Sequence, residues 1–136
     1  MREISPDARK TLTFTVEESM QASFGGRLIH PVLSTWALVH HLEWVARLLL
    51  EPALEDGEEG VGAGVDIRHL SPALRGAAVT VSAGVREQRP RLLVCDVAAR
   101  CEGRKVASGR VFQAVRSRKE LEAARSAGPT PSDGEE

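Results

Sequence analysis

The sequence predicts an α+β domain in which a curved antiparallel sheet wraps around one long central helix. Two observations support this fold class. A single long apolar helix pattern begins near residue 34, and four strand-like runs separated by short turns follow it. Long strands joined by short turns pair antiparallel, and a single apolar helix must bury its face against the sheet that they form.

The segments before the helix are predicted to be one strand and one irregular connection. Residues 9–16 alternate apolar side chains with threonine, which is typical of a half-buried strand. Residues 19–32 contain Gly25, Gly26 and Pro31, and these residues interrupt any regular pattern. We therefore expect a short helix followed by a loop that covers a site as a lid.

The long helix has clear start and stop signals. Ser34 or Thr35 can cap its first turn, and Pro52 or Gly57 marks its end. On a wheel of about 100° per residue, apolar side chains cover more than half of the circumference, so we expect the helix to be largely buried. A narrow polar stripe on the opposite side consists of His40, Arg47 and Glu51.

The rest of the chain is expected to be a sheet, a short helix and a tail. Strands are predicted in meander-like succession at residues 60–70, 77–87, 91–101 and 104–115. They complete one domain over residues 1–116. The charged stretch 117–125 is rich in helix-forming residues and predicts a short exposed helix. Residues 126–136 are small, polar and acidic, so we expect a disordered tail.

Composition and charge argue against several classes of function. The 136 residues include 18 Lys and Arg against 19 Asp and Glu, and this net charge of −1 lacks the basic footprint of a nucleic-acid binder. Residues 1–10 are charged from the start and show no signal peptide, and charges interrupt the long helix, so no membrane contact is predicted. Cys95 and Cys101 match no metal motif and are interpreted as buried free thiols of a cytoplasmic protein without a metal.

Glu43 breaks the pattern of its helix. On the wheel it lies at about 80°, between Leu50 at about 60° and Trp36 at about 100°, inside the apolar arc. A buried carboxylate is costly to ionise and its pKa tends to rise, which suits a general base or nucleophile near neutral pH. The alternative interpretation is a glutamate at the rim of the helix whose carboxylate reaches water.

His69 and two glycines stand out on the strand at residues 60–70. His69 continues the apolar, core-facing row of this strand, where it can donate a hydrogen bond to a substrate carbonyl or to a carboxylate. The alternative is a structural histidine at the sheet edge. Gly62 and Gly64 occupy the opposite row, and glycine within a strand indicates close approach of a ligand or another backbone, or close packing of helix on sheet.

Thr35 lies at the helix entrance. Its hydroxyl can cap the helix, and the unpaired N–H groups of the first turn can hold a carbonyl oxygen as it becomes an oxyanion. Thr35 and Glu43 are eight residues apart, or about 12 Å along the axis, so they cannot touch. We expect them to line one groove together.

These residues resemble a known family. The segments PVLSTWALVHHLEWVA and VGAGVDIRHL are similar to the fluoroacetyl-CoA thioesterase-like branch of the hotdog-fold thioesterases. The resemblance implies the hotdog fold over about residues 1–116 and a catalytic set of Thr35, Glu43 and His69. It also implies hydrolysis of a small acyl-CoA without a further cofactor, and a homodimer whose sites lie at the subunit interface. Substrate contacts are expected from Ser34, Trp36 and Gly62.

One departure concerns the closing strand. Members of this family commonly carry a Gly-x-His-x-Arg segment there, whereas this chain has Gly109, Val111 and Gln113 at the corresponding positions. Gln113 cannot carry the charge with which arginine pairs phosphate or carboxylate. A hotdog protein that binds acyl-CoA or another small ligand without turnover is therefore kept as the alternative. An enoyl-CoA hydratase is the third class, although the Asp/His pair that it would need does not stand out.

Overall fold

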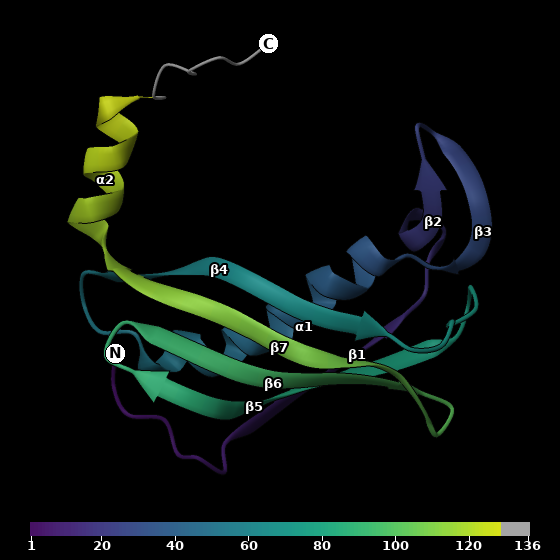
Figure 1. Ribbon diagram of the computed structural model, residues 1–136, viewed down its shortest axis with the longest axis horizontal. Coiled ribbons are helices and arrows are strands. Elements are labelled where there is room, and N and C mark those ends of the chain that lie inside the picture. Colours follow the sequence, from purple (N-terminus) through teal and green to yellow (C-terminus); the bar gives the residue numbers. More distant parts are fainter. Residues whose placement is uncertain (129–136) are drawn as a thin grey trace.

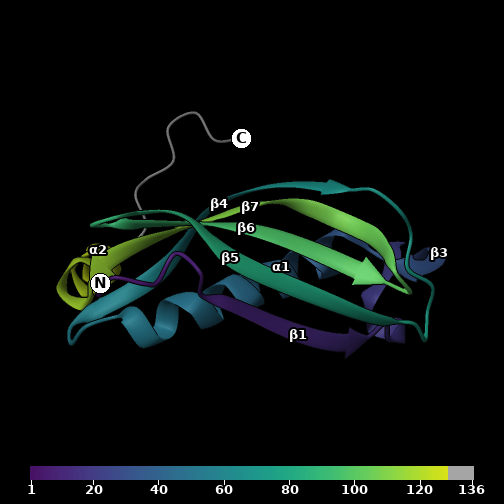
Figure 2. The same ribbon diagram turned by 90° about the horizontal axis from the view of Figure 1, so that it is seen from below.

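The computed structural model describes residues 1–128 and has the predicted α+β architecture. A five-stranded antiparallel sheet curves around one long helix, α1 (Thr35–Leu50) (Figure 1). The strands of this sheet are β1 (Arg9–Thr15), β4 (Glu58–His69), β5 (Ala78–Arg89), β6 (Leu92–Cys101) and β7 (Arg104–Ser117). Figure 2 shows the helix lying against one face of the sheet, so the molecule has two layers. None of the helices within residues 1–128 is long and apolar enough to cross a membrane.

The strand order is β1-β5-β6-β7-β4, which differs in one respect from the predicted meander. Strands β5, β6 and β7 follow one another as expected, but β4 pairs with β7 and not with its successor β5. The reason is that β5 already has β1 on its other side, so it offers no free edge to β4. The strand that carries Gly62 and His69 is therefore an edge strand of the sheet.

The core lies between α1 and the sheet, and the helix is positioned by its cap. Ser34 is the N-cap, because its side-chain oxygen accepts a hydrogen bond from the backbone N–H of Ala37 at 3.1 Å. Of the two candidate caps, Ser34 thus fills the role and the Thr35 hydroxyl is free for another partner. After Leu50 the chain continues into a short 3-10 turn, η2 (Glu51–Ala53), which contains Pro52.

The connection before α1 is more regular than predicted. The short helix is present as η1 (Glu18–Met20), but the expected loop is a hairpin of β2 (Gln21–Phe24) and β3 (Arg27–Leu33). Gly25 and Gly26 both have positive φ angles, 59° and 76°, and such a Gly-Gly pair forms a tight two-residue turn. This hairpin stands beside the N-terminal end of α1 (Figure 1).

Strand β4 contains a bulge between Gly62 and Gly64, where its register with β7 shifts by one residue. The extra residue, Ala63, reverses the alternation of side chains between the two faces. Gly62 and His69 therefore both face α1, although they are seven positions apart. The expectation that His69 and the glycine row lie on opposite faces was wrong for Gly62, because it assumed a regular strand.

The chain leaves the sheet through an exposed helix, α2 (Arg118–Ala127). Its N-cap is Ser117, which forms a capping box with Glu120, so the helix begins one residue later than the predicted range 117–125. The helix also includes two residues that were expected in the tail over 126–136. Residues 129–136 of that tail lie outside the described residues.

Candidate active site

Two of the predicted site residues form a pair at the start of α1. Thr35 is the first residue of α1 and His69 is the last residue of β4, and Oγ1 of Thr35 lies 2.9 Å from Nδ1 of His69. At this distance the two atoms form a hydrogen bond, and the tautomer of the imidazole decides which of them donates. The pair exists because the neighbouring Ser34 caps the helix, which leaves the Thr35 hydroxyl free, and because the bulge turns His69 toward α1.

The second ring nitrogen of His69 has no hydrogen-bond partner in the described part of the chain. Nε2 is buried and makes no hydrogen bond to any group within residues 1–128. Burial also lowers the pKa of His69, since the protonated imidazole loses its hydration. At neutral pH this ring is therefore neutral, and it can exchange a proton through Nε2. A buried polar atom without a partner is costly, so a group that binds Nε2 gains from the contact.

Glu43 lies at the rim of the helix, which is one of the two interpretations that the sequence left open. Its side chain is exposed and not buried in the apolar arc. The physical reason is that β4 is the edge strand, and no further strand of the described chain covers this side of α1. A carboxylate so placed depends on a ligand or another copy of the chain for any burial.

Gly62 gives the Glu43 carboxylate its space. A Cβ atom built on Gly62 would lie 3.2 Å from Oε2 of Glu43, which is tighter than ordinary van der Waals contact. Of the interpretations of this glycine, the structure shows close packing of helix on sheet, because what approaches is the Glu43 side chain of α1. The bare backbone of Gly62 thus lies directly beside the acidic group.

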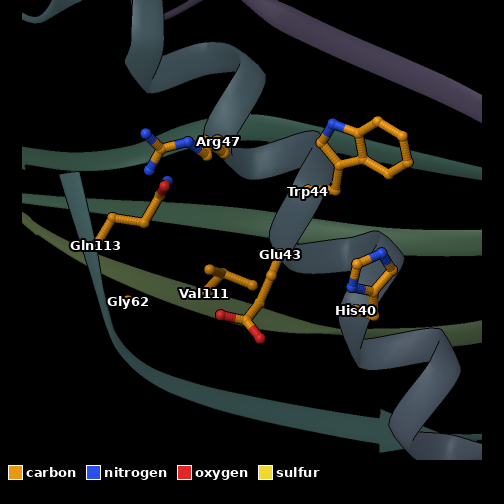
Figure 3. Close-up of a pocket in the computed structure, with 7 residues that line it drawn as sticks. All are labelled: His40, Glu43, Trp44, Arg47, Gly62, Val111 and Gln113. Carbon is orange, nitrogen blue, oxygen red and sulfur yellow. The ribbon is translucent and has the colours of Figure 1, made fainter.

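Glu43 and Gly62 share an open pocket of about 460 Å³ between α1, β4 and β7. Figure 3 shows the seven residues that line it: His40, Glu43, Trp44, Arg47, Gly62, Val111 and Gln113. Neither Thr35 nor His69 belongs to this lining, so the expectation that Thr35 and Glu43 line one groove is not met within the described chain. The chain separates the candidate site into the Thr–His pair at the start of α1 and the carboxylate pocket at its middle.

The other expected substrate contacts have mixed positions. Ser34 is buried and its hydroxyl oxygen is occupied by the helix cap. Trp36 is half exposed, at 48%, and stands outside the pocket lining. Sequence reasoning assigned no role to His40, Trp44 or Arg47, although His40 and Arg47 are two of the three residues of the predicted polar stripe and both line the pocket.

The two positions that depart from the family pattern also line the pocket. Val111 is buried and apolar, and Gln113 is buried with its Nε2 donating to the backbone oxygen of Ala46 in α1 at 3.1 Å. Gln113 therefore ties β7 to the helix and brings an amide to the pocket wall. Among residues 1–128, no group of three or more His, Cys, Asp or Glu side chains is arranged to hold a metal ion.

Comparison with known proteins identifies the family. The family model described as fluoroacetyl-CoA-specific thioesterase matches residues 16–119, which is most of the chain. The chain belongs to this family. The match includes α1, the pocket and the Thr35–His69 pair, and it supports thioester hydrolysis as the general class of activity. Among proteins of curated function, none matches this chain.

Solved structures agree with this assignment. A Thermus thermophilus hypothetical protein, described as a thioesterase superfamily member, is 32% identical with a TM-score of 0.90, and the match covers 93% of this chain and 94% of that one. The fluoroacetyl-CoA thioesterase FlK is 24% identical with a TM-score of 0.84, covering 94% and 99%. A hot-dog-like protein from Thermanaerovibrio acidaminovorans is 21% identical with a TM-score of 0.86, covering 95% and 96%. The predicted hotdog fold is thereby confirmed.

Proposed function

We propose that this protein hydrolyses small acyl-CoA thioesters to the free acid and coenzyme A. The observation that carries the proposal is the hydrogen bond between Thr35 and His69 at the start of α1, with the buried Nε2 of His69 left free. Family membership and the relatives support it, since FlK variants have been solved with acetyl-CoA and with fluoroacetate and CoA.

The start of α1 supplies the polar groups that polarise a thioester. The N–H groups of Thr35 and Trp36 belong to the first helical turn, where backbone donors have no intrahelical acceptor. Such donors, together with the positive end of the helix dipole, stabilise the negative charge that develops on a carbonyl oxygen. Neutral His69 can add a hydrogen bond from Nε2 in the tautomer that carries its proton there.

The reaction requires a nucleophile and a leaving group. Glu43 either activates water or Thr35, or attacks the thioester carbonyl itself. In each case the oxygen that adds to the carbonyl displaces the thiolate as the C–S bond breaks. If Thr35 or Glu43 is acylated, water then releases the acid. A thiol with a pKa near about 8.5 leaves readily and needs little acid assistance, so the side chains of the chain suffice without a further cofactor.

The site also requires a second copy of the chain. Glu43 lies about 12 Å along α1 from Thr35, too far to act on a group held by the pair in the same chain. The edge position of β4 and the exposed Val61, Val65 and Trp44 support a surface that an assembly would bury. We propose a homodimer in which Glu43 of one copy meets the Thr35–His69 pair of the other.

The cellular setting follows from the substrate. Coenzyme A thioesters are water-soluble metabolites, and the two buried cysteines, Cys95 and Cys101, are free thiols in the structure. A reducing compartment keeps such thiols unpaired. We therefore place the activity in the cytoplasm.

The direct test is thiol release from a panel of acyl-CoA thioesters with short, long and aromatic acyl groups. Glu43→Ala is expected to abolish turnover of the best substrate while circular dichroism and the melting temperature stay unchanged. Glu122→Ala, which changes another exposed glutamate, on α2, is the matched control and should keep full activity. Unchanged turnover in Glu43→Ala would overturn the assignment of Glu43.

A binding protein without turnover is the second candidate, and Val111 and Gln113 favour it because they replace the polar His and Arg of the family pattern. Tight binding of an acyl-CoA by calorimetry, with no release of thiol over hours, would establish this alternative. An enoyl-CoA included in the same panel tests hydration, because loss of its conjugated double bond is followed independently of thiol release.

A further inference from the structure

We propose that Arg47, assisted by Gln113, binds a carboxylate at the far end of the acyl group, so that the substrate is the CoA thioester of a short dicarboxylic acid. This inference rests on the proposed function and specifies its substrate class. It starts from the pocket at the middle of α1, where the lining includes one guanidinium group and one buried amide that the hydrolytic chemistry does not use.

The guanidinium of Arg47 is held on two of its three nitrogens. Nε donates to Oε2 of Glu51, one turn further along α1, at 2.9 Å, and Nη1 donates to the backbone oxygen of Gly60 on β4 at 3.1 Å. The Arg47–Glu51 ion pair is 41% and 49% exposed and contributes little to stability. The ion pair instead helps to orient the guanidinium, because the hydrogen bonds from two of its nitrogens fix the plane of the group and the direction of its free edge.

The third nitrogen, Nη2, makes no hydrogen bond to any group within residues 1–128. Arg47 lines the pocket, so this nitrogen is a cationic donor available to a ligand there. Arginine pairs with carboxylates through short, charge-assisted hydrogen bonds, which are stronger than neutral ones. A preoriented guanidinium with a free edge is therefore suited to bind an anionic oxygen.

Gly60 makes this orientation possible. A Cβ atom at residue 60 would lie 3.3 Å from Nη1 of Arg47 and 2.5 Å from Cδ2 of Leu50. A side chain at residue 60 would clash with Leu50 and crowd the Arg47 guanidinium, so the glycine leaves room for both side chains beside the backbone of β4. The second glycine on the α1 face of this strand, Gly62, in the same way gives space to Glu43.

Gln113 provides a second polar group on the same wall. Its amide is buried and anchored to Ala46, the residue before Arg47, and Figure 3 shows the end of its side chain turned toward the Arg47 guanidinium. Because the Gln113 amide is neutral, it can stay buried here at lower cost than a second cation, which would also repel Arg47. The two residues thus form a polar end of a pocket whose remaining wall includes Val111 and Trp44.

Distance decides which anion fits. Arg47 follows Glu43 by four residues on one helix, which is one turn and about 6 Å along the axis. If Glu43 acts at the thioester carbonyl, Arg47 lies within reach of a group a few bonds along the acyl chain. The phosphates of coenzyme A are separated from the sulfur by the whole pantetheine arm, so a carboxylate of the acyl group is the better match.

The test compares kcat/KM for CoA thioesters of three- to five-carbon dicarboxylic acids with neutral acyl-CoA thioesters of equal chain length. The wild-type protein is expected to prefer the carboxyacyl substrates by about 10- to 100-fold, the contribution of a hydrogen bond to a charged group. Arg47→Met should abolish this ratio and Arg47→Lys should retain part of it. Arg110→Met, an exposed arginine on β7 outside the pocket, should leave the ratio unchanged.

A second set of substrates separates the two sources of anion. Thioesters of N-acetylcysteamine carry the same acyl groups but no phosphate. If Arg47→Met abolishes the preference with these substrates too, the acyl carboxylate is the partner. If Arg47→Met impairs only CoA thioesters, and does so equally for neutral and carboxyacyl groups, Arg47 binds phosphate and the inference is overturned.

The outcomes also distinguish this inference from the proposed function. Failure to hydrolyse any thioester in the panel contradicts the proposed function. Hydrolysis of neutral thioesters without preference for the carboxyacyl ones leaves the proposed function intact and contradicts only the role of Arg47. Circular dichroism and melting temperatures of both Arg47 variants check that they are folded.

Discussion

Candidate site residues lie at both the start and the middle of α1, and the two groups have different surroundings. At the start, the Thr35–His69 pair is complete within one chain, partly buried, and joined by a 2.9 Å hydrogen bond. At the middle, the Glu43 carboxylate is exposed in an open pocket with Gly62 and Arg47. One chain thus joins the two polar groups at the helix start but leaves the Glu43 carboxylate uncovered. The environment of Glu43 has to come from substrate or from a second copy.

The largest expected effect comes from a substitution that disrupts both regions at once. Gly109 on β7 pairs with Ile67 of β4, and a Cβ atom there would lie 2.0 Å from the backbone oxygen of Asp66. Gly109→Ala must therefore push β4, which carries Gly62 and His69, away from β7. We expect a loss of about 3 kcal/mol or more in the free energy of unfolding, measured by denaturant titration.

Gly64→Ala is the matched control on the same pair of strands, because its Cβ would meet Phe112 at an ordinary 3.7 Å. Its free energy of unfolding should stay close to that of the wild type. Equal stability of the two variants would show that the β4–β7 contact tolerates a side chain at residue 109.

The next effect tests whether the two regions act across a dimer. Glu43→Ala and His69→Ala are each expected to be inactive alone. If a site combines Glu43 of one copy with His69 of the other, a refolded 1:1 mixture should regain about a quarter of the wild-type activity, because half of the dimers are mixed and each mixed dimer has one intact site.

No recovery would show that both groups act within one chain, or that no mixed dimer forms. Carrying a different affinity tag on each variant and purifying the doubly tagged species separates these two outcomes. A doubly tagged dimer without activity contradicts the shared site.

A smaller effect concerns the middle of α1 alone. In Gly62→Ala, the new Cβ would come within 3.2 Å of Oε2 of Glu43, so the carboxylate has to shift by a few tenths of an ångström. Because catalysis depends on positioning, kcat/KM should fall by about tenfold while the melting temperature changes little. A melting temperature that falls in parallel with activity would instead indicate a packing role for Gly62, and Gly64→Ala again serves as the control.

The smallest expected effect is on how the free energy of unfolding depends on pH. Burial lowers the pKa of both His41 and His69 from the ordinary value of 6.5. Below that value the unfolded chain binds more protons than the native chain, so the free energy of unfolding should decrease as the pH falls from 7 to 5. The buried ring of His41, stacked on Phe14 with centroids 3.7 Å apart, is the better probe because it lies away from Thr35.

His41→Gln should flatten the dependence of the melting temperature on pH, whereas the same substitution at the exposed His30 should not. Activity that depends on a neutral His69 should persist below pH 6.5 and decline only at lower pH. A rise in stability on acidification would contradict the assigned direction of both shifts.

The start of the site could be predicted from sequence because its signals are local. Ser34 and Thr35 stand where a polar residue must begin an apolar helix, and His69 ends a strand-like run. The helix start, the fold class and the Gly62 contact were thus within reach of pattern and resemblance. The structure adds which residue does what: Ser34 caps the helix, and Thr35 forms a hydrogen bond with His69.

The middle of the site could not be predicted, because it depends on relations that no local pattern records. The burial of Glu43 depends on whether a neighbouring strand covers it, and the strand order that leaves β4 at the edge follows from the pairing of β1 with β5. Arg47 looked like part of an ordinary solvated stripe. Its fixed position in the pocket becomes visible only in the structure, where the backbone of Gly60, thirteen residues later, accepts its hydrogen bond.

The single extra residue in β4 decides which face of the sheet the side chains after it point to. Gly62 and His69 are separated by an odd number of positions, so a regular strand of the same length would turn one of them outward. Deleting Ala63 would remove the bulge and leave the two residues six positions apart, an even separation that again places them on one face. A strand that kept Ala63 but lost the bulge would instead place the imidazole and the bare backbone on opposite sides of the sheet. A relative with a gap at residue 63 can therefore build the same arrangement on a regular strand, whereas a relative without the gap needs the bulge.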